Sequence, residues 1–111
     1  MNNIKKDYKL IVTIVEKGNA EEVIEYSKMG GAEGGTIIPG RGLGANDTTK
    51  ILGMLIEPEK EVVIILIPKS KVSSVLTAIT EGMNLEKPGR GISFVLDVPL
   101  VAGIFGDEKD G

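Results

Sequence analysis

The chain has 111 residues, which is the size of a single domain. It contains no Cys, His or Trp, so it lacks thiolate nucleophiles, the usual general base and the commonest transition-metal ligand. A net charge of −3, with only two Tyr and two Phe, disfavours nucleic-acid binding, which needs basic patches or stacking aromatics. We therefore expect no catalytic residue, no metal site and no nucleic-acid partner.

Neither membrane insertion nor secretion is expected. The longest apolar run, residues 62–67, has six residues, whereas a membrane-spanning helix needs about 20. Residues 1–7 contain charges and no apolar stretch, so we expect no signal peptide. The expected location is the cytoplasm.

The first part of the chain predicts one strand and one helix. Residues 8–15 are mostly apolar and β-branched, which is typical of a strand. A helix follows Asn19, because Asn is a favoured N-cap and Glu22 lies three residues on, as in a capping box. Gly30 and Gly31 end this helix, since glycine tolerates the left-handed conformation.

The middle of the chain has weaker signals. Residues 34–38 predict a short strand, and residues 39–50 are rich in turn formers without any period. Residues 54–56 regain strand character, and residues 57–60 read as a charged turn.

The last part predicts a strand, a helix and a final strand. Residues 61–67 have the strongest strand pattern of the chain, and a helix follows with Ser70 as its N-cap. The apolar stripe of this helix has helical spacing and comprises Val72, Val75, Leu76, Ile79 and Met83. Residues 84–91 form a loop, residues 92–96 a strand and residues 99–111 a C-terminal tail whose last residues we expect to fray.

The element order is therefore β-α-β-β-α-β within one domain, residues 1–111. This order predicts an α+β, ferredoxin-like fold, with a four-stranded antiparallel sheet and both helices on one face. Residues 10–15 and 62–67 are apolar without the alternation of a half-exposed strand. Both faces of these strands must then be covered, and burial against other copies of the chain, in a trimer, is the simplest way.

The only two arginines of the chain occupy identical frames, Pro39-Gly40-Arg41-Gly42 and Pro88-Gly89-Arg90-Gly91. A guanidinium is a planar donor fork suited to phosphate or carboxylate, and flanking glycines let backbone N–H groups approach an anion. Each copy alone also fits a simple turn with an exposed arginine at its tip. The pairing favours an anion site, although no P-loop lysine accompanies it.

Over residues 8–101 this layout resembles the PII signal-transduction proteins, and Pro88-Gly89-Arg90-Gly91-Ile92-Ser93-Phe94-Val95 carries the resemblance most clearly. It implies a homotrimer that binds adenine nucleotides in clefts between subunits, with a phosphate-binding B-loop at residues 87–91. It also implies a partner-docking T-loop at residues 43–53. The implied ligand-binding residues are Gly40, Arg41, Gly42, Lys60, Lys87, Gly89, Arg90 and Gly91. The implied partner-binding residues are Leu43, Asn46, Asp47, Thr48, Thr49 and Lys50.

Three departures from the PII pattern bear on the ligand. Residues 43–53 are few for a T-loop and contain no Tyr, the chain has no Gln, and residues 101–105 contain no Arg. We therefore expect ADP or AMP, or a similar small anion, rather than ATP with 2-oxoglutarate. No cofactor is required. The resemblance implies a regulator that controls an unidentified transporter or enzyme through the T-loop, in nitrogen regulation.

Two other classes of function compete with this interpretation. A ligand-free oligomerisation or scaffold module on the same fold would need no charged pocket and would tolerate loss of both arginines. An enzyme of the acylphosphatase kind shares the ferredoxin-like plan, but its phosphate loop follows the first strand, and residues 16–19 contain no Arg. We therefore expect that the protein is not an enzyme.

Overall fold

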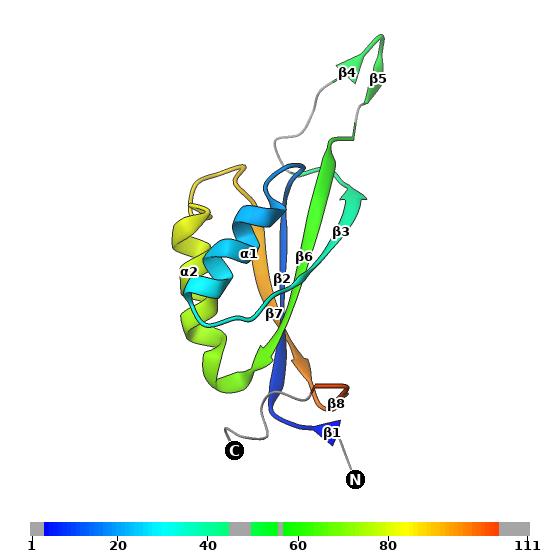
Figure 1. Ribbon diagram of the computed structural model, residues 1–111. Coiled ribbons are helices and arrows are strands. Elements are labelled where there is room, and N and C mark those ends of the chain that lie inside the picture. The colour runs from blue at the N-terminus through cyan, green and yellow to red at the C-terminus, as the bar shows by residue number, and fades with distance from the viewer. Residues whose placement is uncertain (1–3, 45–49, 56, 105–111) are drawn as a thin grey trace.

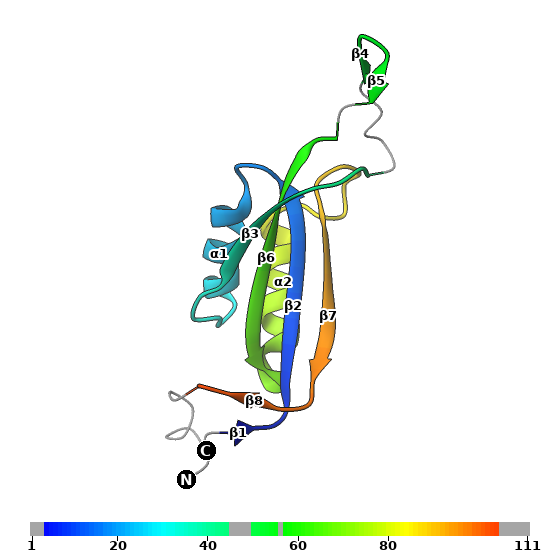
Figure 2. The same ribbon diagram turned by 90° about the vertical axis from the view of Figure 1, so that its right-hand side faces the viewer.

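The structure is a computed structural model that describes residues 4–44, 50–55 and 57–104. Its central layer is a four-stranded antiparallel sheet in the order β3-β6-β2-β7 (Figure 2). The strands are β2 (Tyr8–Glu16), β3 (Thr36–Arg41), β6 (Glu59–Pro68) and β7 (Ile92–Val98).

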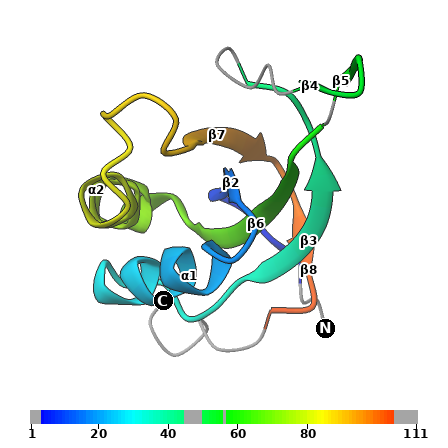
Figure 3. The same ribbon diagram turned by 90° about the horizontal axis from the view of Figure 1, so that it is seen from above.

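Both helices lie on the same side of this sheet, as Figures 1 and 3 show. They are α1 (Ala20–Met29) and α2 (Val72–Gly82), and a short 3₁₀ turn, η1 (Lys69–Lys71), precedes α2. The mixed fold with two helices and antiparallel sheets is thus confirmed.

Four short strands lie outside the six elements of the predicted order, and one of them falls at residues 54–55, where the sequence indicated strand character. β1 (Ile4–Lys5) pairs with β8 (Val101–Ala102) near the two ends of the described chain. β4 (Lys50–Ile51) pairs with β5 (Met54–Leu55) in a small hairpin that begins in the predicted T-loop, residues 43–53, and ends two residues beyond it. This hairpin projects beyond the end of the sheet (Figure 1). Asn46, Asp47, Thr48 and Thr49 lie outside the described residues.

The core lies between the helices and the facing side of the sheet. Its apolar side chains are at most 2% exposed, and burying each of them contributes about 1.5–3 kcal/mol. From the sheet they are Ile11, Val15, Val63, Ile65 and Ile67, from the helices Val23, Val75 and Ile79, and from the residue directly after α2 Met83. Three members of the predicted stripe of the second helix, Val75, Ile79 and Met83, are therefore fully buried.

The other face of the sheet is also apolar but is not covered by any helix. Paired residues on neighbouring strands share a face, so the register places Leu10 beside Leu66 and Leu96, and Val12 beside Ile64 and Phe94. On β7 the side chains of Ile92, Phe94 and Leu96 are 57%, 39% and 47% exposed. We call this surface the open face; it consists of Leu10, Val12, Ile14, Val62, Ile64, Leu66, Ile92, Phe94 and Leu96.

Of the two predicted N-cap positions, the structure confirms Asn19 but not Ser70. Asn19 is the N-cap of α1, but its side chain makes no capping hydrogen bond. Instead, Glu61 Oε1 on β6 accepts hydrogen bonds from the backbone N–H groups of Gly18 and Ala20, at 2.9 and 3.0 Å, and places a negative charge at the helix N-terminus. The Ser70 cap was wrong, because Ser70 lies within η1 and α2 begins one residue later than this cap requires.

Candidate functional site

A cavity of about 640 Å³ opens at one end of the sheet. In the antiparallel order, the ends of β2 and β3 and the starts of β6 and β7 all lie at this end. The cavity lining therefore comes from four separate segments: residues 14–16, residues 40–44, Lys60 with Val62, and the loop before β7 with its first residue.

The first Pro-Gly-Arg-Gly copy reaches this cavity on a strand. The turn-forming residues at 39–50 predicted an irregular loop here, and for the first three of them this prediction was wrong. Pro39, Gly40 and Arg41 pair with Glu61, Lys60 and Glu59 as the last residues of β3. Proline is tolerated there because β3 is an edge strand with one neighbour. The Arg41 side chain is exposed and makes no ion pair with any described residue.

The second copy reaches the cavity on a loop, and its glycines are required by the backbone. Gly89 and Gly91 have φ values of +81° and +136°, in the range that favours glycine. A Cβ at Gly91 would lie 2.8 Å from the carbonyl oxygen of Ile14, so β2 itself excludes a side chain there. Both glycines line the cavity.

Arg90 differs from Arg41 in already having a partner. Its Nε donates a hydrogen bond to the Met83 carbonyl oxygen at 3.2 Å, and its side chain is half-buried. Met83 follows the last residue of α2, so the guanidinium caps a helix C-terminus, where a positive charge is favourable.

The cavity also contains an ion pair. Lys60 Nζ donates to the Glu16 carboxylate, and the Lys60 side chain is only 14% exposed. The remaining described ion pairs join Lys17 to Glu59, at 3.1 Å, and Lys9 to Asp97. The Lys9 hydrogen bond and charge lower the pKa of Asp97, a residue that lies toward the opposite end of β7.

Six of the eight predicted ligand-binding residues line this one cavity: Gly40, Arg41, Gly42, Lys60, Gly89 and Gly91. Lys87 and Arg90 do not line it; Lys87 is exposed and donates its backbone N–H to Asn84. The role of all eight residues stays a prediction. The apolar wall of the cavity, formed by Ile14, Val15, Val62 and Ile92, was not predicted, because the topology decides which strand ends meet. Leu43, predicted to contact a partner, also lines this wall.

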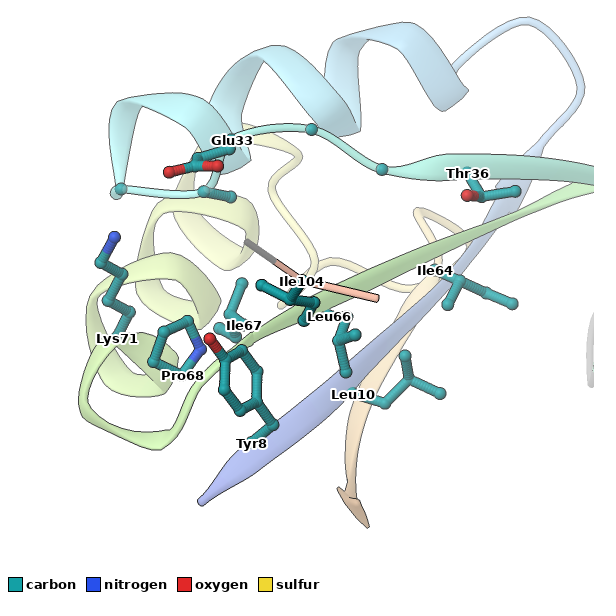
Figure 4. A pocket seen from close by; sticks show the side chains of 14 residues that line it. Tyr8, Leu10, Glu33, Thr36, Ile64, Leu66, Ile67, Pro68, Lys71 and Ile104 are labelled. Atoms are coloured by element: carbon teal, nitrogen blue, oxygen red, sulfur yellow. The ribbon is translucent and has the colours of Figure 1, made fainter. Parts of the chain in front are cut away.

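A second cavity, of about 520 Å³, lies where the loop between α1 and β3 passes over the second half of β6. Its lining includes residues 31–36, Leu66, Lys71 and Ile104. Figure 4 shows Tyr8 beside Pro68 and Ile104 in this cavity. Tyr8 is 6% exposed, and its hydroxyl has no hydrogen-bond partner among the described residues. No motif in the sequence pointed to this cavity.

The comparisons with known proteins agree with this architecture. The family model described as "Nitrogen regulatory protein P-II" matches residues 8–108. No helix in the described part of the chain is long and apolar enough to span a membrane, and no curated protein sequence is significantly similar to the chain.

Two solved structures have the same fold. PII from Arabidopsis thaliana, bound to citrate, is 24% identical with a TM-score of 0.65 over 86% of this chain and 78% of that one. CPII, a nitrogen regulatory PII-like protein from Thiomonas intermedia K12 bound to ADP, AMP and bicarbonate, is 18% identical with a TM-score of 0.67. That match covers 92% of this chain and 99% of that one.

Proposed function

The chain belongs to the nitrogen regulatory protein P-II family, and we propose that it is a PII-like regulator whose ligand is ADP or AMP, or a similar small anion. The ligand binds between subunits of a homotrimer and changes how the loop at residues 43–53 contacts a target transporter or enzyme. The protein acts in nitrogen regulation in the cytoplasm and catalyses no reaction itself.

The observation that carries this proposal is the meeting of the two Pro-Gly-Arg-Gly copies at one cavity. Gly40 and Arg41 line it from the end of β3, Gly42 from the next residue, and Gly89 and Gly91 from the loop before β7. A phosphate or carboxylate suits such a site, because glycine backbones allow close approach and Arg41 supplies an exposed donor fork. The ligands of the two similar structures, citrate in one and ADP, AMP and bicarbonate in the other, belong to this chemical class.

A nucleotide also needs an apolar surface for its base. The wall of Ile14, Val62 and Ile92 supplies part of that surface within one chain. The cavity beside Tyr8 has a partly apolar lining, and the buried Tyr8 hydroxyl has no hydrogen-bond partner among the described residues. In a trimer we place this cavity of a neighbouring copy on the base side of the cleft. An unpaired buried hydroxyl costs about 1–3 kcal/mol, so a ligand or neighbouring chain that pairs with it would stabilise the complex.

The open face supports the trimer. It is a contiguous apolar surface on one side of the sheet, with Ile92, Phe94 and Leu96 all more than one-third exposed in the single chain. Apolar patches of this kind mark interfaces, and obligate interfaces resemble a protein core. Light scattering should therefore give about three times the chain mass of 11.8 kDa, and a monomer would contradict this part of the proposal.

Calorimetric titration with ADP, AMP and adenosine tests the ligand. We expect saturable binding of ADP and AMP, and weaker binding of adenosine, which lacks the phosphate. Arg41→Ala should weaken ADP binding. The control is Lys28→Ala, which should leave ADP binding unchanged, because Lys28 is exposed on α1 and lines neither cavity.

The alternative is a scaffold without a ligand, and the open face is the observation that favours it. If the trimer is intact but neither ADP nor AMP binds at millimolar concentration, the scaffold alternative replaces the sensor proposal.

A further inference from the structure

The hairpin formed by β4 and β5 presents its turn at the far end of the molecule. The molecule measures 59 × 26 × 19 Å, and Figures 1 and 2 show this hairpin beyond the end of the central sheet. Ile51 pairs with Met54, so Leu52 and Gly53 form a two-residue turn. Their φ values are +52° and +80°, and positive φ at both positions is the pattern of a type I′ turn.

Leu52 is unfavourable at this turn in two respects: its backbone has positive φ, and its apolar side chain is exposed. Positive φ is strained for a bulky side chain, and Asn or Gly is the usual residue at the first position of a type I′ turn. The Leu52 side chain is also 94% exposed, so packing within the chain does not offset the strain. A residue that breaks two local rules without a compensating contact in its own chain points to a contact outside it.

We propose that Leu52 is an anchor that enters an apolar pocket on a target protein, with Met54, 64% exposed on β5, packing at the rim of that pocket. This proposal rests on the proposed control of a target through residues 43–53 and names the chemistry of the contact. An apolar pocket of leucine size complements Leu52, and the flexible Met54 side chain adapts to its edge. Burial of one leucine changes affinity by about 10- to 100-fold.

A protein pocket fits this tip better than a membrane or a second copy of the chain. Two side chains bury less apolar surface than a single myristoyl chain, which itself gives only marginal membrane binding. The net charge of −3 adds no attraction to anionic lipids. In the proposed trimer the copies bury the open face of the sheet, whereas the hairpin extends past the end of that sheet.

The first experiment measures whether Leu52 serves the fold. We expect Leu52→Asn to leave the urea midpoint of unfolding unchanged or to raise it, because Asn adopts positive φ more readily. A clearly lower midpoint would mean that Leu52 stabilises the protein itself, and it would overturn the proposal.

The second experiment identifies and titrates the target. A photoreactive leucine analogue at position 52 is crosslinked in cells, and each captured protein is identified, purified and titrated with wild-type protein, Leu52→Asn and Leu100→Asn. Leu100 is the matched control, because it is 59% exposed and lies beyond β7, away from the hairpin. We expect Leu52→Asn to bind about 10- to 100-fold more weakly, and Leu100→Asn to bind like the wild type.

The proposal would be overturned if no protein were captured from position 52, or if the wild type and Leu52→Asn bound the captured protein equally well. It would also be overturned if the wild type floated with phosphatidylcholine or anionic vesicles and Leu52→Asn did not, because Leu52 would then contact a membrane. ADP and AMP titrations of Leu52→Asn separate this proposal from the sensor proposal. Loss of target binding with normal nucleotide binding supports the anchor, whereas absence of nucleotide binding in the wild type contradicts the sensor alone.

Discussion

In the first Pro-Gly-Arg-Gly copy, the chain is an edge strand, and Arg41 has an exposed side chain without an ion pair among the described residues. In the second copy, the chain is a loop after α2, and Arg90 donates a hydrogen bond to the Met83 carbonyl oxygen at 3.2 Å. Four identical residues thus present one open guanidinium at the cavity and one that closes a helix end.

The difference comes from the neighbours of each copy and not from the four residues. β6 lies beside the first copy and pairs with Pro39, Gly40 and Arg41 in antiparallel register. The second copy follows the C-terminus of α2, where backbone carbonyl groups lack intrahelical partners and attract a positive charge. The same motif therefore leaves Arg41 open at the cavity in the first copy, whereas Arg90 has a structural partner in the second.

The largest expected difference between the copies is at their last glycines. We expect Gly91→Ala to lower the free energy of unfolding by about 2–4 kcal/mol, because a Cβ there meets the Ile14 carbonyl oxygen at 2.8 Å and φ is +136°. A Cβ at Gly42 meets nothing within 4 Å, so Gly42→Ala should change stability by less than about 0.5 kcal/mol. Urea unfolding of both variants at equal protein concentration measures these changes in stability. Equal losses in Gly91→Ala and Gly42→Ala would contradict the predicted difference between the two copies.

Local sequence patterns predict some elements of the fold correctly and misassign others. The β-branched runs at residues 8–15 and 61–67 and the stripe of Val75, Ile79 and Met83 are strong periodic signals, and the structure confirms them. Pro39 and Gly40 were misassigned because both residues break strands in local rules. Whether an edge strand tolerates them depends on the pairing with β6, which no local pattern shows.

Only part of the candidate site could be predicted from the sequence, because the rest depends on which strands are neighbours in the sheet. Arginine occurs only at Arg41 and Arg90, so composition alone singled out both frames. The apolar wall and the Glu16–Lys60 ion pair depend on which strand ends meet, and this follows from sheet order and not from spacing. The Tyr8 cavity joins segments distant in sequence and carries no motif.

The next largest effect concerns ligand affinity. Arg41→Ala should weaken ADP binding by about 10- to 100-fold, since a charge-assisted hydrogen bond contributes about 1.5–3 kcal/mol. Arg90→Ala should weaken it less, because Arg90 does not line the cavity and its Nε is engaged by Met83. Calorimetric titration of both variants with ADP measures which substitution costs more affinity. A larger loss of affinity in Arg90→Ala than in Arg41→Ala would contradict this prediction. Arg41→Lys should recover only part of the affinity, because a point charge does not replace the fork.

Stability should show the opposite order for the two arginines. Arg90→Ala removes the hydrogen bond to Met83 and the positive charge at the end of α2, so we expect a loss of about 1–2 kcal/mol in the free energy of unfolding. Arg41→Ala should stay within about 0.5 kcal/mol, because the Arg41 side chain is exposed and makes no ion pair with a described residue. If both variants unfold at the same urea concentration, the Arg90 cap contributes nothing measurable.

The smallest expected difference is at the second residue of each copy. Gly89 has φ +81° with open space around it, so Gly89→Ala introduces strain without a clash and should cost about 1 kcal/mol. Gly40 lies in β3 outside the positive-φ range, and a Cβ there would touch Val62 Cγ2 at 4.0 Å, an ordinary contact. Gly40→Ala should therefore be neutral or raise stability by up to about 1 kcal/mol, because alanine loses less backbone entropy on folding. Urea midpoints that shift in the same direction for both variants would show that strand and loop do not distinguish the two copies at this position.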